Sequence, residues 1–396
     1  MRNLPSPKGD RVLNHRPRFQ PLVFALAVLL FSSGAFAQAK KPQQQPAPNA
    51  KTCEKYTLLG KLYYSNNQLD AAYVAFRQCV TLEPNNTEAL YNLGRVEIKL
   101  RLYSAAIEHF KKAISVDSKF VSAYLGLSQS YSRQYIDSKD RVTVKAQLDE
   151  ALRVLEDAER VATTNTQKAA VYNERGTIYK YKGETEKAIE AFKKALGFEP
   201  DGAAILFNLG ALQMQVGKYA DSVESMRKAV DLEPKNAQNR AFLAKALRLT
   251  KDDKSALSEA TQAYNLAGGA RGKDAFVIGQ YGITQYANKN MNAAKSALEL
   301  AVKVDEGTYH ENYYYLGRVY LETSQARDAR AQLSKAAFIE PSEPLYWFWL
   351  GQANEASSLK EDACKSYAAA LKAKPGYPEA QTASTALKCP TAPSAR

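Results

Sequence analysis

The chain has 396 residues, of which 54 are Lys or Arg and 41 are Asp or Glu, so its formal net charge is +13. Hydrophobic residues make up 45% and charged residues 24%, as is typical of globular proteins. This composition excludes a mostly disordered chain, a collagen and a polytopic membrane protein. Four cysteines and three histidines leave little material for a metal centre.

The first 37 residues have the three parts of a secretory signal peptide. Basic residues precede an apolar stretch at 22–31, and small residues then lead to Ala35-Phe36-Ala37. Because a membrane-spanning helix needs about 20 apolar residues, we favour cleavage after Ala37 over an uncleaved membrane anchor. Cleavage leaves 49 basic and 40 acidic residues, a net charge of +9. We therefore expect an exported protein, periplasmic in the first instance, with a secreted or anchored protein as the alternative.

Residues 38–52 are rich in Pro, Gln and Lys. Such a segment cannot bury enough apolar area to fold, so we predict a disordered linker there and a similar tail at 390–396.

Between these ends, a small residue recurs at a nearly fixed spacing. A second small residue follows most of these markers by 12 residues, and a larger apolar one, such as Phe76 after Gly60, follows by 16. The small residues allow two helices to approach closely, and the large one fills the gap that they leave. The markers, mostly 34 residues apart, are Gly60, Gly94, Ser128, Gly176, Gly210, Ala244, Gly282, Gly317 and Gly351.

Each unit contains two helical stretches, because its apolar residues recur at spacings of three and four. In the fourth unit these are about 167–182 and 185–197. Helices this short are not stable alone in water, so they must pack against each other and against the next unit. In five units a proline follows the marker by 24 residues and ends the second helix.

This pattern resembles the tetratricopeptide repeat (TPR), a 34-residue helix–turn–helix unit. The resemblance implies an all-α fold: about nine repeats over residues 53–377, stacked into a right-handed superhelical solenoid and closed by a capping helix at 378–389. It covers about 90% of the chain after residue 37. The fourth unit carries most of the family signature, in Tyr172, Gly176, Tyr179, Ala188, Phe192, Ala195 and Pro200.

Two irregularities interrupt the repeat. The third unit has an insertion at about 133–148, which we interpret as a solvated extension, with a partner-contacting projection as the alternative. A glycine-rich segment at 268–272 separates sub-arrays at 53–270 and 275–377. Residues 264–274 form either a hinge or a plain long turn.

The cysteines lie at the two ends of the array. Cys53 and Cys79 stand at the start of one predicted helix and the end of its partner, while Cys364 and Cys389 belong to the last unit and the capping segment. An exported protein with an even number of cysteines favours disulfides. We predict Cys53–Cys79 and Cys364–Cys389, each closing about 25 residues and stabilising by about 3 kcal/mol. Buried free thiols are the alternative.

No catalytic constellation, phosphate-binding loop or histidine-rich metal site is found in the sequence. The repeats also leave no segment large enough for a separate catalytic domain. We therefore predict a protein that is not an enzyme and that needs no cofactor.

In the family that the chain resembles, the first helix of each unit lines a concave groove that commonly holds a peptide or a partner's helix. Aromatic and basic side chains there favour an extended partner segment with acidic groups or a free carboxylate. Packing of several aromatics between helices is the alternative. The predicted groove residues are Lys61, Tyr64, Tyr91, Arg95, Lys180, Phe207, Lys245, Arg248, Tyr286, Tyr314, Arg318 and Phe348.

These features together predict an exported scaffold that holds a partner protein or peptide, in cell-envelope or pilus-type assembly by analogy with exported proteins of similar repeat content. The alternatives are an accessory subunit that presents substrate to an envelope enzyme or secretion machine, and a cell-wall glycan-binding protein. We expect no nucleic-acid partner, and the positive charge suits an anionic envelope surface instead.

Overall fold

The computed structural model describes residues 50–305 and 307–390. Helices account for most of this part of the chain, and no strand is formed within it. The α-helices are α1 (Ala50–Ser65), α2 (Leu69–Leu82), α3 (Thr87–Lys99), α4 (Tyr103–Val116), α5 (Val121–Asp137), α6 (Ala146–Val161), α7 (Asn165–Lys182), α8 (Thr185–Phe198), α9 (Ala203–Gln215), α10 (Tyr219–Leu232), α11 (Ala237–Leu249), α12 (Asp253–Leu266), α13 (Ala275–Ala287), α14 (Met291–Val304), α15 (His310–Glu322), α16 (Ala326–Ile339), α17 (Pro344–Ala356), α18 (Lys360–Ala373) and α19 (Pro378–Ala386).

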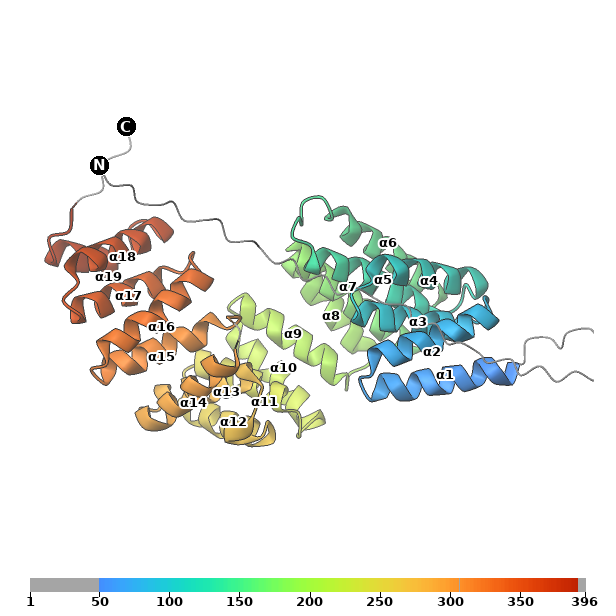
Figure 1. Cartoon of the computed structure of the whole chain (residues 1–396), viewed down its shortest axis with the longest axis horizontal. Helices are drawn as coiled ribbons and strands as arrows, with labels where there is room; N and C mark the ends of the chain where they lie inside the picture. The colour runs from blue at the N-terminus through green and yellow to red at the C-terminus, as the bar shows by residue number, and fades with distance from the viewer. Residues whose placement is uncertain (1–49, 306, 391–396) are drawn as a thin grey trace, which may run out of the picture. The chain divides into compact units, whose positions relative to one another are not determined.

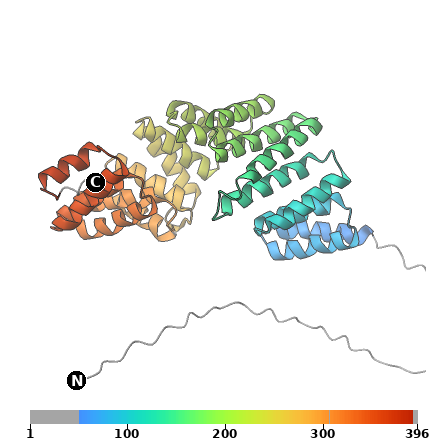
Figure 2. The same cartoon turned by 90° about the horizontal axis from the view of Figure 1, so that it is seen from above.

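The helices form nine successive hairpins, α1–α2 to α17–α18, and α19 packs against α18. Each helix contacts its hairpin partner most extensively and the following hairpin next, so the hairpins stack in chain order (Figure 1). Figure 2 shows the same order from a second side, with each hairpin lying beside the next one in the sequence. The fold is the predicted all-α repeat solenoid.

The marker glycines have the packing role that their spacing predicts. A methyl group added at Gly94 would lie only 2.7 Å from the ring of Phe110, which is fully buried. The sixth unit packs its two helices with other residues. Ala244 stands at the marker position in place of glycine, and Ala260 stands where the other units have a large apolar residue. Both alanines are fully buried, so the methyl group at 244 takes up part of the space that a larger side chain would fill.

The turns inside the hairpins share a feature that the sequence pattern did not predict. The residue seven positions after the marker adopts a left-handed conformation in eight of the nine turns. It is glycine in two of them and a non-glycine residue in six, with φ between 57° and 68°. A side chain in this region carries a steric cost of roughly 1 kcal/mol. The non-glycine residues are Asn67, Arg101, Lys251, Lys289, Ser324 and Ser358.

The insertion in the third unit lengthens both helices of its hairpin. The two helices α5 and α6 have 17 and 16 residues, whereas α3 and α4 have 13 and 14. The connecting residues 138–145 are largely exposed, and Val142 has 87% of its surface accessible. This geometry is that of the solvated extension, while contact with a partner stays a hypothesis.

The predicted limits of the array need one correction. The first helix, α1, begins at Ala50 rather than at residue 53, so the last three residues assigned to the linker are helical. At the other end, α19 falls within the segment predicted to cap the last unit. The predicted signal peptide, residues 1–37, the linker up to residue 49 and the tail from 391 onwards lie outside the described residues.

The glycine-rich segment after α12 forms a compact turn. Gly269–Arg271 make one turn of 3-10 helix, and Gly268 and Gly269 have positive φ. The rings of Tyr264 and Tyr281 stack across the segment with their centroids 4.2 Å apart. All described residues belong to one compact unit, and motion at this joint stays a hypothesis.

Candidate functional site

The structure places every predicted groove residue on the first helix of a hairpin. These first helices, the odd-numbered ones from α1 to α17, contact one another in succession along the solenoid. Together they form what we call the first-helix face. The predicted side chains on this face nevertheless fall into four sets with different surroundings.

A pocket of about 410 Å³ lies between α1, α3 and α5. The guanidinium of Arg95 lies over the rings of Tyr64 and Tyr91, with its carbon 4.7 and 5.6 Å from their centroids. Cation–π contact of this kind positions the arginine without neutralising its charge. Lys61 is exposed and forms an ion pair with Glu88. The pocket residues are Tyr64, Arg95, Ile98, Lys99, Arg101, Tyr103, Gln129, Arg133 and Asp137.

Several of these residues could not be found from the groove pattern. Arg101 lies in the turn after α3, and Arg133 lies five residues after the marker Ser128, one position beyond those used in the prediction. The one signal in the sequence that could have identified Arg101 and Arg133 is their positive charge close to the irregular third unit. Asp137 is the single carboxylate of the pocket, and it accepts a hydrogen bond from Tyr103 and lies 3.6 Å from Arg101.

A buried carboxyl group stands behind this pocket. The side-chain amide of Gln129 donates to Oε2 of Glu174 on α7 over 3.4 Å. Glu174 is only 8% exposed. Burial raises the pKa of Glu174 to about 7, against the opposing effects of the Gln129 hydrogen bond and the Arg133 charge.

The middle of the face carries an aromatic run. Phe207 of α9 packs edge-on against Phe242 of α11, and Phe242 packs against Phe276 of α13, with centroid distances of 4.7 and 4.5 Å. Phe207 thus shows the packing between helices that the alternative interpretation describes. Lys180 on α7 is exposed as a residue, and partial burial of its amine lowers its pKa.

Two predicted basic residues of α11 reach across an entire repeat. Lys245 lies 2.9 Å from the carboxylate of Glu311 on α15, and Arg248 donates to the hydroxyl of Tyr315 over 3.2 Å. Both contacts pass over α13, where eleven of the 13 residues are buried. The sixth and eighth units therefore touch, although the seventh lies between them in the chain.

The remaining predicted residues contact one another. Arg318 lies over Trp349 with its guanidinium carbon 3.4 Å from the ring centroid, and it donates to the hydroxyl of Tyr314 over 2.9 Å. Tyr286 and Tyr314 are 9% and 5% exposed, so little of either is available to a partner. Phe348 packs against Trp349 and the buried Tyr367. Among the predicted groove residues, the basic and aromatic groups that stay accessible together are thus those at the N-terminal pocket.

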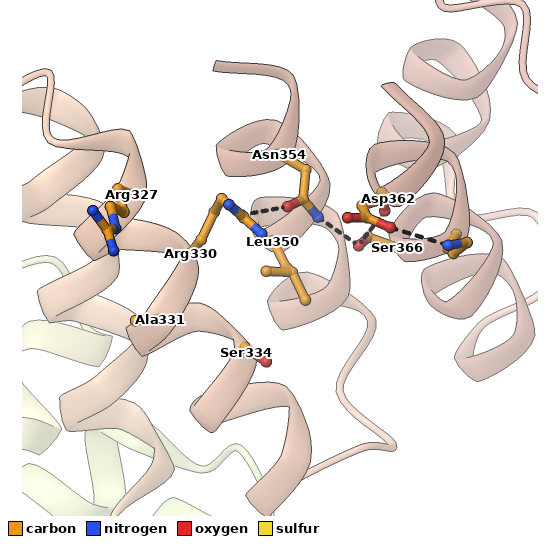
Figure 3. Close-up of a pocket in the computed structure, with 9 residues that line it drawn as sticks. Arg327, Arg330, Ala331, Ser334, Leu350, Asn354, Asp362 and Ser366 are labelled. Atoms are coloured by element: carbon orange, nitrogen blue, oxygen red, sulfur yellow. Dashed lines mark hydrogen bonds and ion pairs between the residues drawn. The ribbon is translucent and has the colours of Figure 1, made fainter. Parts of the chain in front are cut away.

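A second hollow, of about 490 Å³, lies between α16, α17 and α18 (Figure 3). Arg330 donates from Nε to Asn354 over 2.8 Å, and Asn354 donates to Ser366 over 3.1 Å. Lys365 pairs with Asp362 over 3.0 Å. Most polar side chains of this hollow are thus hydrogen-bonded or ion-paired to one another. None of the predicted groove residues lines it.

The predicted cysteine pairs come together at both ends of the array. The Cα atoms of Cys53 and Cys79 lie 4.4 Å apart, and those of Cys364 and Cys389 lie 5.4 Å apart. Both separations suit a disulfide, and titration of four free thiols in denatured, non-reduced protein would refute both predicted bonds.

Within residues 50–305 and 307–390, no three His, Cys, Asp or Glu side chains gather in a way that could hold a metal ion. Across the same residues, no helix is both long and apolar enough to cross a bilayer.

The stacked hairpins and their first-helix face define a helical repeat solenoid. Family models described as TPR repeat and tetratricopeptide repeat match residues 176–217, 203–236 and 314–378, and one described as anaphase-promoting complex, cyclosome, subunit 3 matches 46–113. The chain belongs to the tetratricopeptide repeat family, whose members generally mediate protein–protein interaction or scaffolding.

Similar proteins include BBSome complex member BBS4 of Bos taurus, 29% identical over 143 residues, which are 36% of this chain and 24% of that protein. The chain thus spans about a quarter of the length of this relative. A thermophilic TPR protein of Thermus thermophilus is 33% identical over 49% of this chain and 98% of its own, with a TM-score of 0.45. The APC/C hetero-tetramer Cut9-Hcn1 is 12% identical over 85% of this chain and 90% of its own, with a TM-score of 0.52, and shares the fold.

Proposed function

We propose that this protein is an exported scaffold that binds a partner protein or peptide on its first-helix face, at the pocket between α1, α3 and α5. One observation carries the proposal. This pocket combines exposed cations with tyrosine rings, whereas the other basic groove residues of the C-terminal half are engaged in internal contacts.

The energetics of recognition support this part of the face. Arginine and tyrosine are enriched among residues that dominate binding free energy at protein interfaces. Arg95 already lies against Tyr64 and Tyr91, so less side-chain entropy is lost when it meets a ligand. By contrast, a ligand at Arg318 would have to displace its contact with Trp349.

The cellular setting of the proposal is the bacterial envelope, with pilus-type assembly as one process that needs such a scaffold. Its support is the signal-peptide pattern of residues 1–37 and the net charge of +9 on the rest of the chain. Cell fractionation of the wild type and of a variant lacking residues 2–37 tests export. Equal amounts of both proteins in the periplasmic fraction would contradict it.

Partner binding is tested by affinity capture from an envelope extract. We expect the double variant Arg95→Ala/Arg133→Ala to lose the captured protein that the wild type recovers. The matched control is Arg227→Ala/Lys228→Ala, which removes two exposed positive charges from the second-helix face on α10. Recovery of the same proteins by both double variants would refute the assignment of the site.

A further inference from the structure

We infer that the pocket between α1, α3 and α5 binds the carboxylates of an acidic peptide segment, and that this binding is coupled to a proton on Glu174. The inference rests on the proposed function and adds to it the chemistry of the ligand and a form of regulation.

The charge of the pocket selects an anion. Arg95, Lys99, Arg101 and Arg133 line it, and Asp137 is the one acidic residue among its lining side chains. That carboxylate already interacts with Tyr103 and Arg101, so most of the positive charge is left without an internal partner.

The shape and the donors of the pocket favour carboxylates on a peptide. Arginine side chains bind a carboxylate through two parallel hydrogen bonds, and the amide of Gln129 is a further donor at the wall. A volume of about 410 Å³ has room for one or two glutamate or aspartate side chains. The first helices follow one another along the solenoid, so the rest of an extended segment can continue past the pocket.

Glu174 lies where its charge opposes such a ligand. It accepts a hydrogen bond from Gln129, which lines the pocket, and the charge of Arg133 lowers its pKa in opposition to burial. When Glu174 is ionised, it partly neutralises Arg133 and repels an incoming carboxylate. When it is protonated, this nearby negative charge is removed, and the positive charge of Arg133 acts fully on the ligand.

Few other charged groups near α7 act on Glu174. Arg133 does so from α5, and the charge of Glu174 in turn raises the pKa of Tyr181 on α7. The helix α9 has no charged residue. Other charged groups packed against α7 interact with different residues of that helix. From α6, Asp149 pairs with Lys182 and Glu159 with Arg175. From the turn after α7 and from α8, Glu184 pairs with Lys182, Lys187 lies over Tyr179 and Lys194 lies over Tyr172.

Linkage makes the two binding events reciprocal. If protonation of Glu174 favours the acidic ligand, the ligand must raise the affinity of Glu174 for its proton by the same factor. Because burial raises the pKa of Glu174 to about 7, the change falls in the neutral range. The protein would then hold an acidic partner more tightly as its surroundings become mildly acidic.

The test uses the purified chain and a fluorescent peptide with four consecutive glutamates, compared with the same peptide carrying four glutamines. Fluorescence anisotropy gives the dissociation constant at about pH 6 and about pH 8. The glutamate peptide should bind roughly threefold to tenfold more tightly at the lower pH. Glu174→Gln should bind it equally at both, with the affinity of the wild type at the lower pH.

Two further variants separate the pocket from other titrating groups. Arg133→Gln should weaken binding at both pH values, because it removes a ligand contact. His109→Gln should keep the pH dependence, since this histidine pairs with Glu97 between α3 and α4 and not with the pocket. Circular dichroism of each variant confirms that it is folded.

Three results would overturn the inference: equal binding of the glutamate and glutamine peptides, the wild-type pH dependence in Glu174→Gln, or binding of an anionic polysaccharide with no peptide binding. The proposed function is tested separately. If Arg95→Ala/Arg133→Ala abolishes capture of a partner whose binding by the wild type does not change with pH, the function stands and the proton coupling fails.

Discussion

Replacement of the buried Glu174 by glutamine should make the protein more stable at mildly alkaline pH. Glutamine has nearly the same shape and can still hydrogen-bond to Gln129, but it never carries a charge. Burial raises the pKa of Glu174 from 4.5 to about 7 in the folded protein. The folded state therefore holds a proton that the unfolded chain releases, and this stabilisation is complete below about pH 4.5 and is lost as the pH rises through 7.

The size of the effect follows from the two pKa values. Their difference corresponds to about 3 kcal/mol between the limits of low and high pH. We expect Glu174→Gln to match the wild type at about pH 4 and to exceed its stability by up to about 3 kcal/mol at about pH 8. Residual solvent access at the 8% exposed side chain reduces the value.

Urea denaturation at the two pH values measures the difference in unfolding free energy between the variant and the wild type. Because repeat arrays can depart from two-state unfolding, hydrogen exchange in α5 and α7 shows whether the change in stability is local. The control is Glu156→Gln, which changes an exposed glutamate on α6 and should leave the pH profile as it is. A Glu174→Gln variant with the same pH profile as the wild type would refute the reasoning.

Three further predictions concern packing and turns. A double-mutant cycle with Lys245→Ala and Glu311→Ala should give a coupling of about 1 kcal/mol in urea denaturation, since the two side chains are 23% and 30% exposed; additive effects would contradict a contact between the sixth and eighth units. Gly279→Ala should lower the free energy of unfolding by about 2 kcal/mol, because its methyl group would collide with the buried amide of Asn312. An unchanged free energy of unfolding would show that α13 and α15 lie further apart. Ser324→Gly should raise the free energy of unfolding by up to about 1 kcal/mol, since this residue has a φ of 61°, and a loss of stability would argue against the left-handed turn.

Much of the fold was predictable because its main contacts are local. Gly94 and Phe110 meet inside one hairpin, 16 residues apart, and comparable pairs recur in other units. A contact that repeats at a constant spacing leaves a period in the sequence, and the period identifies the hairpin and its stacking.

The state of the groove residues was not predictable in this way. Whether Lys245 is free or paired depends on how closely α11 approaches α15 across the buried residues of α13. The position of Glu174 behind Gln129 likewise depends on the angle between successive hairpins. Each of these contacts occurs once and leaves no period, so only the three-dimensional structure shows it.

The contacts that pass over α13 also bear on how the molecule responds to tension. In a chain of repeats that touch only their neighbours, units can detach one after another from either end when the two ends are pulled apart. Here the ion pair of Lys245 and the hydrogen bond of Arg248 connect the sixth unit to the eighth. The seventh unit, which lies between them, cannot detach until both contacts break. Units six to eight should therefore yield in a single rupture, with a longer release of chain than one repeat would give.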